Sequence, residues 1–173
     1  MIQLKLVAVL FVIIFLLVGC ASPALEQIRL AGELPGWKLG HKQRDRLTNS
    51  TIWEHIPEND YIGNWSKMVT IQFYAKKQVD PEAFMQGLKS KMARVCNNIQ
   101  SRVLDKQADS ILYEWRIEDC KRYPDQHGLA RIIRGKEGLH RVAYTEKTLQ
   151  IQAETYHKWK KKLLGAYLAA GGQ

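Results

Sequence analysis

The chain has 173 residues, of which 46% are hydrophobic, and its formal charge at pH 7 is +9. This length and this hydrophobic fraction suit one domain with a buried core, and they exclude a wholly disordered chain. The basic excess would suggest nucleic acid for a cytosolic protein, but it also fits anionic lipid headgroups, an acidic protein partner or a surface that is only solubilising.

The N-terminus carries a short apolar segment. One basic residue, Lys5, precedes a run from Leu6 to Val18 that is apolar throughout. At about 1.5 Å per helical residue this run is too short to cross a hydrocarbon core of about 30 Å comfortably. A basic start, a short apolar core and small residues at its end predict a signal peptide over residues 1–19.

The end of that segment, Leu17-Val18-Gly19-Cys20, resembles the lipobox of bacterial lipoproteins. The resemblance implies cleavage before Cys20, a diacylglycerol on its sulfur and an acyl chain on its amine. Two or more acyl chains give a lasting membrane anchor. Ala21, in place of an Asp after the cysteine, implies an outer-membrane location with the domain in the periplasm. The alternative is an uncleaved transmembrane anchor.

Residues 20–36 are expected to be a lipid-anchored tether with a weakly helical patch over 24–31, and residues 37–173 to be the domain. Strands are expected at 37–41 and 47–56, with a solvated turn at 41–46 and a loop at 57–63. The clearest strand covers 65–75. Its apolar side, with Val69, Ile71 and Phe73, alternates with a mixed side.

Asp80-Pro81-Glu82 is a helix start, because Asp caps free N–H groups and Pro suits the first helical position. Apolar residues at three-to-four spacing then predict a helix over about 81–97. Strands are expected at 101–106 and 110–118, and a hairpin at 129–134 and 139–145. A basic amphipathic helix is expected over about 148–168, followed by a loose tail.

This order predicts an α+β fold: an antiparallel sheet with the 81–97 helix across its apolar face and the 148–168 helix beside it. With Cys20 lipidated, Cys96 and Cys120 remain as a pair at the expected ends of a helix and a strand. An oxidising periplasm favours a disulfide between them. The alternative is two unpaired buried thiols.

Glu54, Pro57 and the run Asn64-Trp65-Ser66-Lys67-Met68-Val69-Thr70-Ile71-Gln72 are similar to small proteobacterial outer-membrane lipoproteins, some of them associated with secretion machinery. The paired Cys96 and Cys120 also fit that group. The similarity departs in the loop Glu58-Asn59-Asp60-Tyr61, and it implies no chemistry.

The five histidines lie in no metal-binding spacing, and no nucleophile motif or phosphate-binding loop is present, so we expect neither an enzyme nor a cofactor. The final helix is the main candidate surface: Trp159 stands among Lys158, Lys160, Lys161 and Lys162. It would contact anionic lipid or an acidic partner. The alternative is a helix packed on its own domain with a solvated lysine face.

Two functions follow. The first is a non-enzymatic assembly component of an envelope or secretion complex, with no role in nucleic-acid binding. The second is a ligand- or glycan-binding lipoprotein, or a cryptic hydrolase, with a cleft beside Trp65 and the loop 59–64. A deep pocket that held His55 or His140 next to Asp60 or Glu54 would favour the second function.

Overall fold

The computed structural model describes residues 26–170, and its main element is a seven-stranded antiparallel sheet with the order β2-β3-β4-β8-β7-β6-β5. The strands are β2 (Trp37–Asp45), β3 (Ser50–Pro57), β4 (Lys67–Ala75), β5 (Cys96–Gln107), β6 (Ser110–Cys120), β7 (Gln126–Arg134) and β8 (Gly138–Glu146). The helices are α2 (Pro81–Met92) and α3 (Ala153–Leu164). The predicted antiparallel sheet with two packed helices is therefore confirmed.

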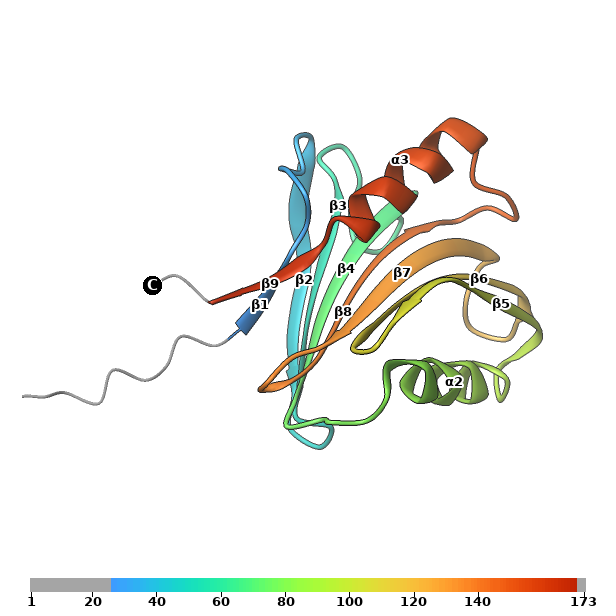
Figure 1. Ribbon diagram of the computed structural model, residues 1–173. Coiled ribbons are helices and arrows are strands. Elements are labelled where there is room, and N and C mark those ends of the chain that lie inside the picture. The colour runs from blue at the N-terminus through green and yellow to red at the C-terminus, as the bar shows by residue number, and fades with distance from the viewer. Residues whose placement is uncertain (1–25, 171–173) are drawn as a thin grey trace, which may run out of the picture.

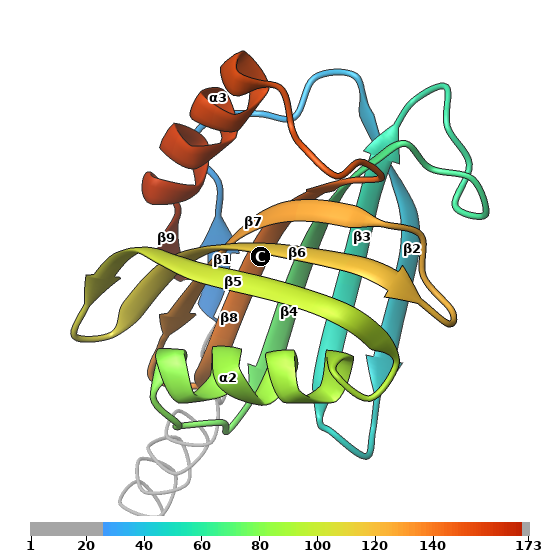
Figure 2. The same cartoon turned by 90° about the vertical axis from the view of Figure 1, so that its right-hand side faces the viewer.

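The sheet is strongly curved. Strands β5, β6 and β7 cross in front of β2, β3 and β4 in Figure 2, with α2 below them. We call the side toward α2 the inner face; on β4 it carries Met68, Thr70, Gln72 and Tyr74. The other side is the outer face, and it carries Val69 and Ile71.

The two helices cover opposite faces of the sheet. Trp159 and Leu163 of α3 pack on outer-face residues such as Val69, whereas Met85 of α2 packs on inner-face residues such as Tyr113. Figure 1 shows α3 and α2 on the two sides of strands β5 to β7. The expected placement of the first helix on the apolar face of β4 was wrong. The reason is that the curled sheet has an apolar lining on its inner face as well.

Helix α2 begins as its sequence predicts. The Asp80 carboxylate accepts hydrogen bonds from the backbone N–H groups of Glu82 at 2.9 Å and Ala83 at 3.0 Å, and Pro81 is the first helical residue. The helix ends at Met92 instead of residue 97, because a turn follows in which the Val95 N–H donates to the Met92 carbonyl. Cys96 then begins β5.

Cys96 and Cys120 form a disulfide, as predicted. Its setting differs from the one expected, since Cys96 lies at the start of a strand and is directly opposite Cys120 in the β5–β6 register. The disulfide therefore joins the edge strand to its neighbour at one end of the sheet.

The ends of the described chain form a second, two-stranded sheet. Strand β1 (Glu26–Arg29) pairs with β9 (Tyr167–Ala170), and Figure 1 shows the pair at one side of the molecule. Residues 26–29 are therefore a strand and not part of the expected helical patch at 24–31. Residues 169 and 170 belong to β9 and not to the expected loose tail. Helix α3 is shorter than the expected 148–168 helix at both ends. It begins at Ala153, because the segment before it is held to the sheet through the Ile151 N–H and His127, and it ends at Leu164, because residues after Gly165 turn into β9.

Among residues 26–170, neither helix has the length and apolar content needed to cross a membrane. The signal segment 1–19 and Cys20 lie outside the described residues.

Candidate ligand-binding cavity

The inner face of the curled sheet lines a cavity of about 650 Å³ that is partly open to solvent. Its walls come from β3 and β4 on one side, β5 and β6 on the other, and α2 and β8 between them. Segments near residues 62–65 and 122–126 add to the lining. Binding sites for small molecules have volumes of about 300–1,000 Å³, so this cavity is in the size range of a ligand site.

Most of the lining is apolar. Three methionines, Met68, Met85 and Met92, contribute to it from β4 and α2. Flexible thioether side chains adapt to ligands of irregular shape. Further apolar side chains come from α2, β5 and β6, namely Leu88, Ile99, Tyr113, Trp115 and Ile117.

One cation, Arg141, lies inside this apolar lining. Its Nε donates to the hydroxyl of Tyr113 at 3.0 Å, and its Nη1 donates to Oε1 of Gln72 at 2.8 Å. Burial by itself would lower the pKa of Arg141, but the nearby Tyr113 and Tyr74 hydroxyls raise it above its usual value. The side chain therefore stays a fixed cation with a defined orientation.

The charged residues of the lining are mainly basic. Glu54 is the one carboxylate among the lining residues, and burial raises its pKa although His41 opposes the shift. The cations are Lys89, Lys91, Arg122, Arg141 and Lys147. Clefts with charges of one sign attract ligands of the opposite sign, so the cavity favours an anion.

Trp65 and its loop stand beside this cavity, as the cleft hypothesis expected. The Asp60 carboxylate accepts hydrogen bonds from the Ser66 backbone N–H at 2.6 Å and from its hydroxyl at 2.8 Å, and these bonds lower the pKa of Asp60. Lys147 lies 4.6 Å from the centre of the Trp65 ring. The loop is therefore held by its own hydrogen bonds, and Asp60 is engaged in its structure.

The two histidines whose presence in this cleft would have favoured the second function lie elsewhere. His55 pairs with Val69 in the β3–β4 register, so it belongs to the outer face, whereas Glu54 belongs to the inner face. His140 stacks on Phe73 with ring centres 4.6 Å apart, and its Nε2 is 3.9 Å from a carboxylate oxygen of Glu26. The structure therefore does not place His55 or His140 beside Glu54 or Asp60 in the cavity, and the arrangement that would have favoured a hydrolase is not found among these residues.

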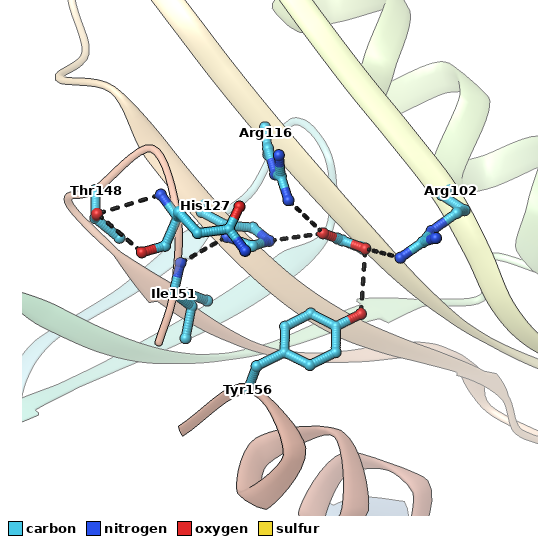
Figure 3. Close-up of polar contacts among 8 residues, drawn as sticks. Arg102, Arg116, His127, Thr148, Ile151 and Tyr156 are labelled. Atoms are coloured by element: carbon cyan, nitrogen blue, oxygen red, sulfur yellow. Dashed lines mark hydrogen bonds and ion pairs between the residues drawn. The ribbon is translucent and has the colours of Figure 1, made fainter. Parts of the chain in front are cut away.

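A second polar cluster lies on the outer face, around Glu114 (Figure 3). Its carboxylate accepts hydrogen bonds from Arg102 at 2.7 Å, His127 at 2.9 Å, and Arg116 and Tyr156, both at 3.1 Å. The Nδ1 of His127 accepts the Ile151 N–H at 2.9 Å, so the ring proton is on Nε2.

Both nitrogens of His127 are thus occupied, and burial lowers its pKa. Burial would raise the pKa of Glu114, but its hydrogen bonds from Arg102, His127 and Tyr156 lower it. Neither group is left to accept a proton from a substrate. The role of the cluster is structural: Tyr156 and the Ile151 N–H join α3 and the loop before it to the sheet.

The predicted basic surface of the last helix is divided by the fold. Trp159 is only 6% exposed and stacks on Tyr144 with ring centres 4.1 Å apart, so its expected role as an exposed membrane or partner contact is wrong. Lys162 donates to the Glu33 carbonyl at 2.6 Å, and Lys160 is half-buried. Lys158 and Lys161 remain exposed.

Arg141, Tyr113 and Gln72 escaped the sequence analysis. Gln72 lies on the mixed side of the strand expected at 65–75, and Arg141 lies in the hairpin strand expected at 139–145. The one available signal was Arg141 itself, a cation at an alternate position among the apolar residues of 139–145. Nothing in the sequence indicated that Gln72, 69 positions away, would meet it.

Comparison with known protein families, curated proteins and solved structures gives no match to this chain. The resemblances to a lipobox and to small proteobacterial lipoproteins therefore remain predictions.

Proposed function

We propose that the protein is a lipid-anchored, periplasm-facing lipoprotein of the outer membrane whose domain binds a small, largely apolar ligand. The observation that carries this proposal is the 650 Å³ cavity inside the curled sheet. Cavities of this size with mainly apolar walls and a few placed polar groups are typical of small-molecule sites. Attachment through an acylated Cys20 would keep such a binding domain beside the membrane.

The test fills the cavity with a side chain. Ser101 lies in the lining, while its neighbour Gln100 is exposed and lies on the opposite face of β5. We expect Ser101→Trp to weaken binding of 1-aminoanthracene, a neutral apolar fluorophore, by at least about tenfold, because an indole would occupy the ligand volume. Gln100→Trp should bind as the unchanged protein does.

Titration by fluorescence measures both variants on a chain that starts at residue 20 with Cys20→Ser, which contains every described element. Thermal melting by circular dichroism confirms that each variant is folded. Equal binding by a folded Ser101→Trp variant, or no binding by the unchanged protein, would contradict the proposal.

The assembly hypothesis is kept as a second proposal because Lys158 and Lys161 of α3 are exposed. A surface of this kind suits an acidic envelope protein or anionic lipid. Cross-linking of the tagged lipoprotein in its own cells, followed by purification from the outer-membrane fraction, tests it. Loss of a co-purified envelope protein in a Lys158→Glu, Lys161→Glu variant would support assembly, and a lone protein in both samples would count against it.

A further inference from the structure

We propose that the ligand of this cavity is a single-chain amphiphile with a carboxylate head, and that Arg141 binds the carboxylate. The inference rests on the proposed function, since it names the class of ligand for the same cavity. Three observations support it: the unusual partners of Arg141, the charges of the lining and the character of the apolar wall.

Arg141 and Arg131 differ from the other arginines that make side-chain contacts, and of these two only Arg141 lines the cavity. Arg102 and Arg116 pair with Glu114, and Arg134 pairs with Asp109. Arg141 bonds only neutral oxygens, and within residues 26–170 no carboxylate lies within 4.0 Å of it. Arg141 is half-buried, so its charge is partly removed from water without an anion, and a bound carboxylate would offset that cost.

The hydrogen bonds of Arg141 fix its guanidinium and leave Nη2 available to an anion. Tyr113 and Gln72 hold the guanidinium through Nε and Nη1, and Nη2 donates to none of the described residues. A guanidinium binds a carboxylate through parallel N–H donors, which a lysine cannot do in the same way. The remaining lining cations, among them Lys89 and Lys147, add an attractive field for an acid.

The rest of the wall selects an acyl chain over a sugar. A glycan presents many hydroxyls and needs several placed donors and acceptors. The lining offers some of these, such as Thr70, Ser101 and Gln126, but most of its exposed area is apolar and comes from methionine, isoleucine and aromatic side chains. Each methylene group of an acyl chain that is buried against such a wall strengthens binding. The larger apolar share of the wall therefore favours an acyl chain over a glycan.

The experiment compares dodecanoic acid with dodecanol, which has the same chain and no charge. Each compound is titrated as a competitor of 1-aminoanthracene on the Cys20→Ser chain of residues 20–173. We expect the acid to bind at least about tenfold more tightly than the alcohol, because hydrogen bonds between a guanidinium and a carboxylate are stronger than those to a neutral hydroxyl. In Arg141→Met this preference should disappear while dodecanol still binds.

Two further variants keep the result interpretable. Arg46→Met removes an exposed cation in the β2–β3 turn and should leave the preference unchanged. Arg141→Lys keeps the charge without the paired donors, and it should show an intermediate preference for the acid. This variant replaces Arg141→Met as the test if Arg141→Met does not fold.

The outcomes separate the two proposals. Equal binding of acid and alcohol by the unchanged protein, or a preference that survives in folded Arg141→Met, would overturn the carboxylate inference and leave the cavity as an apolar site. Failure of 1-aminoanthracene, acid and alcohol alike to bind would overturn the proposed function itself.

Discussion

Glu114 shows how one buried carboxylate organises the outer face. It receives hydrogen bonds from two strands besides its own, β5 and β7, through Arg102 and His127, and from α3 through Tyr156. Arg116 contacts it from its own strand. Because His127 in turn accepts the Ile151 N–H, the loop before α3 is held by the same cluster. The position of α3 therefore depends on polar contacts as well as on Trp159 and Leu163.

Replacing Glu114 with Gln should destabilise the fold by about 1–3 kcal/mol, because hydrogen bonds to a charged group are lost while the arginines stay in place. The loss of stability should be smaller than that caused by breaking a deeply buried salt bridge, since the Arg102 side chain is largely exposed. Urea unfolding measures the change. Glu118→Gln, on the same face of β6 and without a salt bridge, should stay within about 0.5 kcal/mol. Equal stability of both variants would show that the cluster is not needed to hold α3.

Among the elements, the β5–β6 pair is the place where a covalent bond supports an edge of the sheet. Strand β5 has a neighbour on one side only, and it also forms a wall of the cavity. The Cys96–Cys120 disulfide joins the first residue of β5 to the last residue of β6. It therefore stabilises the wall at the end where α2 leads into the sheet.

Replacing both cysteines with Ser should lower the free energy of unfolding by about 3 kcal/mol, the amount that the entropic treatment gives for a loop of about 25 residues. Denaturant unfolding of the double variant, compared with the unchanged chain under oxidising conditions, measures it. A reductant should shift the unchanged chain toward the double variant and leave that variant unaffected. If the reductant shifts neither chain, the disulfide does not contribute to stability in solution.

At the scale of the whole molecule, local patterns predicted most of the sheet, the presence of both helices and the start of α2. The alternation around Val69 and the cap formed by Asp80 and Pro81 are local signals, so each element could be recognised from a few neighbouring residues. Strand β2 was expected to end at residue 41, but it continues to Asp45. It is an edge strand of the sheet, so the basic side chains of residues 42–44 can be exposed to solvent without ending the strand. Edge strands tolerate such residues, and the sequence pattern then resembles a turn.

The cavity and the β1–β9 pair could not be predicted in this way. Arg141 and Gln72 meet only because β8 pairs with β4, and β1 pairs with β9 although some 140 residues lie between them. The amphipathic pattern of α3 identified the helix, but it could not show that Trp159 lies under the helix against Tyr144. These features depend on the curvature of the sheet and on distant pairings, which no local pattern encodes.

The packed histidines give the whole fold a predictable response to acid. Burial lowers the pKa of His55, His127 and His140. The unfolded chain, with histidine pKa values of about 6.5, then binds more protons than the native state, so stability is fully present above pH about 6.5 and falls as the pH decreases below it. The raised pKa of Glu54 acts in the opposite direction. We expect a lower melting temperature at pH 5.5 than at pH 7.5.

A variant isolates the contribution of one ring. His140→Phe keeps an aromatic ring against Phe73 and removes a group whose Nε2 has no hydrogen-bond partner among the described residues. Its melting temperature should therefore fall less between pH 7.5 and pH 5.5 than that of the unchanged chain. His157→Gln, at an exposed position of α3, should show the same fall as the unchanged chain. Equal falls in all three proteins would mean that protonation of His140 does not oppose folding, and that the acid response comes from His55 and His127 or from carboxylates.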